Sequence, residues 1–358
     1  MDDKGIRLKE KISTEVWKTF NRYQIDENNK AMNDPQGADS QYALNAMNIS
    51  KVMNRLKDTP FKSNIMTECK ELFYDKDKTF LKKLDSLNYL LGFKNGVYDL
   101  KREEFRKGRP EDFVSKSTHI NYIPYDPNSQ EIIELNNFYK QICVIENVRK
   151  YLLIRSASFL SGSTSDESFD IYSGKGGNGK SKHMELMEAV FGDYAVKLPI
   201  QLLTNKRGAS NAASPELART QGARLCSMQE PDSGQKLNVG LMKELTGGDK
   251  ITARALYGDP VEFKPQFKMV LCCNDKPGLP PNDEGTWRRV RLTEFQSKFR
   301  YEDEVFEDNV LDFPRDNDIV EKFDDWAEPF MSLLIHHHKD YRKYKLRVPD
   351  EIIEYTSE

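Results

Sequence analysis

The amino-acid sequence predicts an α/β fold, in which a parallel β-sheet is flanked by helices and preceded by a mostly helical N-terminal domain. Three observations support this prediction. A short apolar strand at Phe169–Tyr172 leads directly into the glycine-rich loop Gly174–Ser181. Strands and helices then alternate as far as Cys273, which is typical of a parallel sheet. Between Ile6 and about Leu91, apolar residues recur at helical spacing.

Length and composition limit the possible classes of protein. The 358 residues suit two domains, or one large domain with appendages. No apolar run approaches the roughly 18 residues that cross a bilayer, and Met1–Lys4 does not begin a signal peptide. We therefore expect a soluble intracellular protein with no membrane partner.

Cysteine, histidine and charge give further limits. The five cysteines have no CxxC spacing, so we expect neither a structural zinc site nor a disulfide framework. The run His336–His338 lies in a helix-like stretch and is expected on a solvated helix face. The net charge of −3 does not support nucleic-acid binding by the whole molecule. DNA would have to be held by a local lining, and Lys243–Arg300 is modestly basic whereas Glu302–Glu328 is strongly acidic.

The predicted N-terminal domain covers residues 1–150. It is mostly helical, with a loop at Asn28–Ser40, a stretch rich in Asn, Asp, Gly and Gln. Asn95-Gly96 between two apolar runs predicts a hairpin near residues 93–100, because both residues tolerate positive φ. Tyr122–Pro127 is expected to be a connector interrupted by proline, and Ile132–Leu160 a helical stretch.

The predicted second domain covers residues 151–300, and an acidic to helical C-terminal segment covers 301–358. After the glycine loop we expect a helix that ends at Gly192 and another that begins at Ser214-Pro215-Glu216. A strand at Ala223–Met228, a helix at Asn238–Leu245 and a strand at Phe267–Cys273 follow. These elements complete the α/β pattern.

The loop Gly174-Lys175-Gly176-Gly177-Asn178-Gly179-Lys180-Ser181 fits the P-loop pattern GxxxxGK[ST]. Its glycines allow backbone N–H groups to turn inward and surround phosphate oxygens. Lys180 provides a charge for the β and γ phosphates, and the Ser181 hydroxyl provides a magnesium ligand. The pattern predicts an NTPase that binds ATP and Mg²⁺ through Gly174, Gly176, Gly177, Asn178, Gly179, Lys180 and Ser181.

A carboxylate is expected at the end of a neighbouring strand. Leu225–Gln229 reads as a strand, and Glu230 follows it directly. Such a glutamate can orient the attacking water, or hold magnesium through a water. Gln229 occupies the place of the first acid of the usual pair. Without the upstream loop, Glu230 would be read as ordinary surface charge.

Two alternating runs around Tyr257-Gly258-Asp259-Pro260 predict a second hairpin. Lys250, Arg254 and Lys264 bring cations to it, and Tyr257 brings an aromatic ring. Cations follow phosphates and a ring offers a face to a base, so these four residues are candidates for contact with single-stranded DNA. The alternative for this segment alone is an ordinary solvated hairpin.

Three more residues are candidates for the hydrolysis step. Asn274 follows the strand that ends at Cys273, where an amide can contact the γ-phosphate or the attacking water. Arg288 and Arg289 follow Trp287, and an arginine delivered to a neighbour's γ-phosphate stabilises the transition state. The alternatives are a turn residue for Asn274 and salt-bridged or solvated arginines.

Together these motifs resemble superfamily 3 helicases, and in particular the helicase half of viral and phage primase–helicases of the poxvirus type. The resemblance rests on the glycine loop, Glu230, Thr246–Asp249 with Arg254, Asn274 with Pro277, and Trp287-Arg288-Arg289, in the family's order. Phe93–Leu100 resembles the motif of the domain before the motor. The similarity covers roughly Leu91 to Phe299.

The resemblance implies a ring, usually a hexamer, of AAA+-like ATPase domains that moves along one DNA strand from 3′ to 5′. It implies that Lys180 and Ser181 bind ATP and magnesium, that Glu230 is the Walker B acid and a second metal contact, and that Asn274 is the sensor. Arg288 or Arg289 would be the finger acting in trans. Single-stranded or forked DNA, a primase and other replication proteins would be its partners, in the host cytoplasm or nucleus.

Other functions remain open at this stage. The missing first acid is compatible with a nucleotide-dependent assembly or loading factor, and a P-loop alone is compatible with a small-molecule kinase. No primase-like acid cluster is visible, and relatives usually continue past Val348–Glu351, so a fragment or a reduced version is expected. Hydrolysis stimulated by DNA would separate the helicase from both alternatives.

Overall fold

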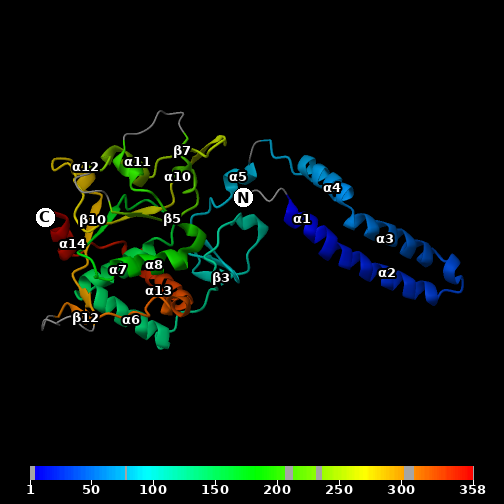
Figure 1. Cartoon of the computed structure of the whole chain (residues 1–358), viewed down its shortest axis with the longest axis horizontal. Helices are drawn as coiled ribbons and strands as arrows, with labels where there is room; N and C mark the ends of the chain where they lie inside the picture. Colours follow the sequence, from blue (N-terminus) through cyan, green and yellow to red (C-terminus); the bar gives the residue numbers. More distant parts are fainter. Residues whose placement is uncertain (1–4, 77–78, 206–212, 231–235, 302–309, 358) are drawn as a thin grey trace. The chain divides into compact units, whose positions relative to one another are not determined.

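The structure is a computed structural model that describes residues 5–76, 79–205, 213–230, 236–301 and 310–357. Its contacts divide the chain into two compact units, Met1–Phe80 and Leu81–Glu358. Figure 1 shows the helices of the first unit and the mixed helices and strands of the second. The domain limits predicted after residues 150 and 300 stay predictions. No helix in the described part of the chain is long and apolar enough to span a membrane.

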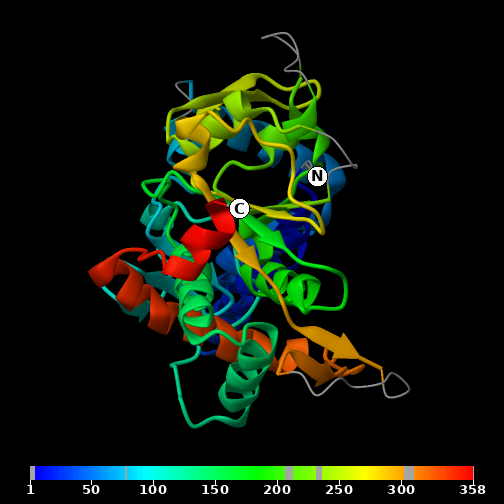
Figure 2. The same cartoon turned by 90° about the vertical axis from the view of Figure 1, so that its left-hand side faces the viewer.

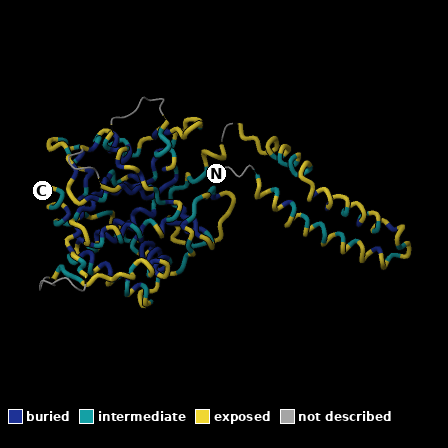
Figure 3. The backbone as a smooth tube through the Cα atoms, in the orientation of Figure 1, coloured by how far each residue is buried: buried dark blue, intermediate teal, exposed yellow. Residues whose placement is uncertain are grey.

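The first unit is helical, as predicted. Ser40 caps the helix that follows it, since its hydroxyl accepts a hydrogen bond from the Ala43 N–H at 3.2 Å. Figure 3 shows that these helices are mainly half-buried or exposed. The helical segments are α1 (Ile6–Lys11), a π-helical turn (Ile12–Val16), α2 (Trp17–Met32), a 3₁₀ turn (Gly37–Asp39), α3 (Gln41–Lys57) and α4 (Thr59–Leu72), with the short α5 (Thr79–Lys83) at the division.

The predicted loop at Asn28–Ser40 is partly wrong. Helix α2 continues to Met32, and only the residues after it form turns. The packing of α2 against α3 outweighs the weak helix propensity of the asparagines. Ala31 is buried, and the Asn45 side chain donates to the Glu27 carboxylate at 2.8 Å.

The hairpin predicted near residues 93–100 is confirmed. Strands β1 (Leu90–Phe93) and β2 (Gly96–Asp99) pair antiparallel, and β3 (Glu104–Arg106) completes a three-stranded sheet. The Asn95 side chain donates to the Tyr122 carbonyl at 3.0 Å and accepts from the Tyr122 N–H at 2.9 Å. The turn therefore holds the start of the connector that the prolines indicated.

A five-stranded parallel sheet forms the centre of the second unit and confirms the predicted fold class. Its order is β10-β4-β9-β6-β5, so β9 lies between the strand before the glycine loop and the strand before Glu230. All four neighbouring pairs are parallel. The strands are β4 (Phe169–Ser173), β5 (Ala195–Lys197), β6 (Leu225–Gln229), β9 (Lys268–Cys272) and β10 (Val290–Glu294).

Alternate residues of the sheet enter two separate hydrophobic cores. Phe169 and Ile171 of β4 lie in one core, whereas Tyr172 lies in the other, as the period of two in a strand requires. Figures 1 and 2 show helices α6, α7, α8 and α13 on one face, with α11 and the β7–β8 hairpin on the other. These helices are α6 (Gln130–Ile142), α7 (Glu146–Ser158), α8 (Lys180–Phe191), α11 (Val239–Thr246) and α13 (Lys322–Tyr344).

Several local predictions are confirmed with small shifts. The expected helical stretch at Ile132–Leu160 is two helices, α6 and α7, and Gly192 ends α8 with a φ of 51°. The remaining elements are short: 3₁₀ turns at Pro110–Asp112 and Gly192–Tyr194, α9 (Gln201–Thr204), α10 (Pro215–Ala218), β7 (Ile251–Arg254), β8 (Pro260–Phe263), α12 (Glu284–Trp287), β11 (Lys298–Arg300), β12 (Asp312–Pro314) and α14 (Asp350–Ser357).

The solvated face predicted for His336–His338 is wrong for His338. This side chain is buried on α13, while His336 is exposed. The long apolar stripe of α13 packs against α6, α7 and α8, and His338 falls on that stripe. Burial lowers the pKa of His338 to about 3, with Lys268 and Arg342 adding to the effect. His338 is therefore neutral near pH 7.

Candidate functional site

The glycine loop connects β4 to α8 and has the conformation that its glycines allow. Gly174, Gly177 and Gly179 have φ values of 145°, 76° and 80°. A Cβ at Gly174 would lie 2.2 Å from the Asn178 side-chain nitrogen and 2.5 Å from the Phe295 carbonyl oxygen, so a larger residue does not fit. The loop ends at the N-terminus of α8, where backbone N–H groups favour an anion.

The segment after β10 holds the loop in place. The buried Asn178 side chain donates to the Phe295 carbonyl at 3.1 Å. The Phe299 N–H donates to the Gly177 carbonyl at 2.7 Å. The loop is thus positioned by residues more than a hundred positions away in the sequence.

Lys180 lies at the carboxyl edge of the sheet and is 6% exposed. Its ammonium group donates to the carbonyls of Gly174, at 3.1 Å, and Cys273, and to the Asn274 side-chain oxygen at 3.3 Å. A lysine charge without a carboxylate partner in the described part of the chain is held here by dipoles alone. This is the position from which it can face phosphate oxygens at the loop.

Asn274 links Lys180 to the predicted acid. Its backbone N–H donates to the Glu230 carboxylate at 3.0 Å, while its side chain accepts from Lys180. Glu230 follows β6 and Asn274 follows β9, and these strands are neighbours in the parallel sheet. The carboxyl ends of parallel strands meet at one edge, so residues far apart in sequence converge there.

Two neighbours of this edge, Cys273 and His183, have pKa values that burial shifts away from their ordinary range. Burial raises the pKa of the Cys273 thiol to about 11, and burial lowers the pKa of His183 on α8 to about 3. Both side chains are therefore neutral near pH 7. The His183 ring also shares a 2.9 Å hydrogen bond with the Tyr139 hydroxyl.

A cavity of about 490 Å³ opens beside the loop, next to Gly177, Asn178, Gly179 and Ser181. Its other walls come from α6, from residues 315–322 and from the start of α13. The rings of Phe138 and Trp326 lie 5.8 Å apart on this wall, and Phe299 also lines it. The volume lies within the roughly 300–1,000 Å³ typical of small-molecule sites.

Arg288 and Arg289 are paired within the chain, with Glu167. Their guanidinium groups lie 3.1 Å and 2.7 Å from its carboxylate. The Arg289 side chain is only 9% exposed and also donates to the Gly285 carbonyl at 2.8 Å, whereas the Arg288 side chain is 65% exposed. The two arginines that the sequence treats alike therefore differ, since only Arg288 faces solvent.

The second predicted hairpin is confirmed by β7 and β8, which pair antiparallel. Tyr257 is fully exposed at its tip with a φ of 58°. Lys250 pairs with Glu262 across the strands at 2.9 Å, and Arg254 donates to the Gly258 carbonyl at 3.0 Å. Lys264 is exposed at the base and lines a separate cavity with Gly247 and Gly248.

The structure thus brings Lys180, Glu230 and Asn274 together, with Ser181 beside them on the loop. Arg288 and Arg289 both pair with Glu167. Among the described contacts, neither arginine pairs with Lys180, Glu230 or Asn274. The sequence reasoning missed Glu167 and the aromatic wall of the cavity. No local pattern marks these residues. Glu167 meets the arginines because β4 and β10 pair in the sheet, and Phe138 and Trp326 meet through the packing of α6 and α13.

The glycine loop follows β4, the second strand in the order of the parallel sheet. This arrangement defines an α/β protein of the P-loop class. Comparisons with known proteins agree. Residues 3–144 match the family described as D5 N terminal like, and residues 171–289 match a family of unknown function, DUF5906. A putative helicase of Acanthamoeba polyphaga mimivirus is 42% identical over 319 residues, covering 87% of this chain and 33% of the viral protein.

Other viral proteins are similar over most of this chain. A putative helicase of Frog virus 3 is 29% identical, with 80% of this chain and 36% of that protein covered. A putative primase of African swine fever virus is 28% identical, covering 70% and 26%. The chain is similar to these viral proteins named helicases and primases, which agrees with its resemblance to the superfamily 3 helicase half of viral primase–helicases. It spans about a third of the length of the first two relatives.

Among solved structures, the apo form of the NrS-1 C terminal region is similar in fold. The two chains are 12% identical, the match covers 80% of this chain and 76% of that one, and the TM-score is 0.46.

Proposed function

We propose that this chain is an ATP-dependent DNA helicase of viral or mobile-element DNA replication, which forms a ring and moves along single-stranded DNA. One observation carries the proposal. Asn274 binds Lys180 through its side chain and Glu230 through its backbone, so a phosphate-binding cation, an amide and a carboxylate meet at one sheet edge. In a motor, contacts between Lys180, Asn274 and Glu230 would let a change at the nucleotide alter the positions of β6 and β9.

The residues at the edge fit ATP and magnesium. Ser181 on the glycine loop and Glu230 after β6 are both exposed, and both carry side-chain oxygens. Oxygen ligands suit Mg²⁺. When bound, the metal would neutralise charge on the phosphates. Lys180 would bind the β and γ phosphates, the N-terminus of α8 would donate to them, and Glu230 would accept a proton from, or orient, the attacking water. The cavity with Phe138 and Trp326 would hold the base.

The helicase proposal assigns separate roles to the remaining predicted residues. Arg288 would act as the finger on a neighbouring subunit, because its side chain is exposed. Arg289 would position it, since Glu167 holds both arginines. Tyr257, with Lys250, Arg254 and Lys264, would contact DNA from the β7–β8 hairpin. The chain's similarity to proteins named helicases and primases supports this assignment.

The test is the rate of ATP hydrolysis with and without single-stranded DNA, together with sizing with and without ATP. We expect several-fold stimulation by DNA in a ring-sized species. Nucleotide binding with a slow rate that DNA does not change would instead favour a nucleotide-dependent assembly or loading factor. Gln229, in the place of the first acid, is the sequence feature that keeps this second function in view.

A further inference from the structure

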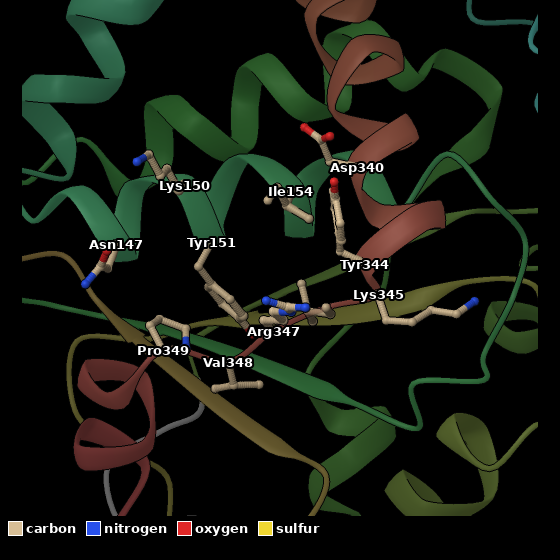
Figure 4. Close-up of a pocket in the computed structure, with 11 residues that line it drawn as sticks. Asn147, Lys150, Tyr151, Ile154, Asp340, Tyr344, Lys345, Arg347, Val348 and Pro349 are labelled. Carbon is tan, nitrogen blue, oxygen red and sulfur yellow. The ribbon is translucent and has the colours of Figure 1, made fainter.

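A second cavity, of about 520 Å³, lies away from the glycine loop. Its walls come from α7, from the last turns of α13 and from the connector before α14. Figure 4 shows Tyr151 and Ile154 of α7 on one side and Tyr344 on the other, with the segment from Lys345 to Pro349 below. None of these residues takes part in the site described above.

The end of α13 and the connector after it are rich in positive charge. Four of the six residues from Arg342 to Arg347 are cations. Arg342 pairs with Glu103 at 2.9 Å. In the part of the chain that the structure describes, Lys345 and Arg347 have no carboxylate within ion-pair distance, although both line the cavity. An anionic ligand is therefore favoured at this end.

One acidic side chain, that of Asp340, also lines the cavity and restricts where an anion can lie. Asp340 is part of the wall on α13, and its nearest basic atom is the His337 ring at 3.9 Å. Lys150 on α7 is paired with Glu146. An anion would therefore lie beside the connector, near Lys345 and Arg347, and an uncharged part of the ligand would lie towards the apolar wall.

The cavity offers an aromatic surface beside these cations. Tyr344 is 48% exposed, and the Arg347 guanidinium and Lys343 ammonium lie over its ring, 5.7 Å and 4.7 Å from the ring centre. Tyr151 is 3% exposed, and its hydroxyl has no hydrogen-bond partner among the described residues. A ligand with a planar ring and an anionic group matches this combination.

We propose that this cavity is a second contact site for single-stranded DNA, in which a base lies against Tyr344 and its phosphates lie against Lys345 and Arg347. Stacking on an exposed ring next to unpaired cations is the chemistry by which proteins hold single strands without reading sequence. An acidic peptide would use the cations but not the exposed ring, so DNA fits better. The proposal rests on the proposed function in that DNA is the substrate.

The charges on the β7–β8 hairpin support a second site. Lys250 is paired with Glu262, and Arg254 is bonded to a carbonyl of its own turn. Among the described residues, neither Lys345 nor Arg347 has a carboxylate partner, although Arg347 lies over the Tyr344 ring. A phosphate that binds them therefore breaks no ion pair. The cavity volume is also within the range that holds a nucleotide-sized ligand.

The test is the affinity of the full chain for a fluorescent oligothymidine at several salt concentrations, with and without ATP. We expect Tyr344→Ala and Arg347→Ala each to weaken binding by about 10-fold. Arg347→Ala should also make the slope of log K against log salt concentration shallower by about 0.7, which corresponds to the loss of one phosphate contact. Tyr344→Ala should leave this slope unchanged. Tyr344→Phe keeps the ring and should bind normally. Lys339→Ala is the matched control, because Lys339 is an exposed cation on α13 outside the cavity.

The outcomes separate this proposal from the proposed function. If Tyr257→Ala weakens DNA binding while Tyr344→Ala and Arg347→Ala match the Lys339→Ala control, the cavity is not a DNA site but the helicase proposal stands. If Arg347→Ala instead abolishes binding of a poly-glutamate peptide and leaves DNA affinity unchanged, the cavity binds acidic peptides. A chain with no saturable DNA binding would overturn both proposals.

Discussion

The carboxyl edge of the parallel sheet and the β7–β8 hairpin both carry predicted site residues, but the chain positions them differently. At the edge, Lys180 is buried and bonded to three oxygens before any ligand is present. On the hairpin, Tyr257 is fully exposed. Chemistry on phosphates needs fixed donors, whereas contact with a moving strand needs an accessible surface. Substitutions should therefore have large effects at the edge and small ones on the hairpin.

The largest effect is expected for Lys180→Ala. It removes the cation that we propose binds the phosphates, and it leaves the carbonyls of Gly174 and Cys273 without their donor. ATP hydrolysis and unwinding should fall to background, measured by phosphate release and by strand separation. Retained turnover would show that the phosphate site lies elsewhere and would break the comparison.

Arg288→Ala should lower the hydrolysis rate by about 10³-fold, the typical contribution of an arginine finger, and leave nucleotide affinity nearly unchanged. Arg289→Ala is the matched comparison. It removes the buried partner of Glu167, so we expect a loss of thermal stability together with lower activity. Restored hydrolysis when inactive Arg288→Ala subunits are mixed with Lys180→Ala subunits would support action in trans. Weaker binding alone would argue against a finger.

The packing of α13 against α6, α7 and α8 should respond to acid through His338. Its pKa is about 3 in the folded chain against about 6.5 when exposed, so the unfolded state binds more protons between these values. Stability should therefore fall as the pH drops from about 6.5 towards 3. His338→Leu should reduce the loss between pH 6.5 and 4 by about 2–3 kcal/mol, at about 1.4 kcal/mol per pH unit.

The His338 experiment is a pair of urea titrations at the two pH values. His183 and His337, whose pKa values are also lowered by burial, contribute equally in both proteins, so the difference isolates His338. The same loss in the His338→Leu variant would mean that His338 is protonated in the folded chain.

The smallest effect is expected for Tyr257→Ala on the hairpin. Because the ring makes no packing contact that the fold needs, thermal stability and hydrolysis without DNA should not change. The DNA concentration that gives half-maximal stimulation of hydrolysis should rise by about 10-fold, the contribution of one stacked base to affinity. A half-maximal concentration that is unchanged would return the hairpin to the ordinary solvated hairpin that its sequence alone allows.

The sequence was informative where a short pattern determines a local structure. Gly174–Ser181 fixes a strand, a loop and a helix start, and Asn95-Gly96 fixes a hairpin. The meeting of Lys180, Glu230 and Asn274 could also be predicted, because parallel strands bring their carboxyl ends to one edge.

Other features depend on packing between distant segments and could not be predicted in this way. Arg288 and Arg289 are adjacent in sequence, yet only the fold shows that Arg289 is buried against Glu167. The same holds for His338, because a run of three histidines does not show which of them lies on the buried face of a helix. Trp326 lines the cavity beside the glycine loop because α13 passes there. The sequence near the loop does not predict that position of α13.

Strand β10 connects the arginine pair Arg288 and Arg289 to the segment that holds the glycine loop. All five of its residues pair in register with β4, from Val290 with Phe169 to Glu294 with Ser173. Arg289 lies directly before the strand, and Phe295, whose carbonyl holds Asn178 of the phosphate loop, directly after it. A paired strand transmits a displacement along its axis rather than absorbing it. A force on the arginines that leaves the sheet intact would therefore reach the glycine loop of the same chain. In the ring that we propose, β10 would act as a mechanical lever between adjacent nucleotide sites.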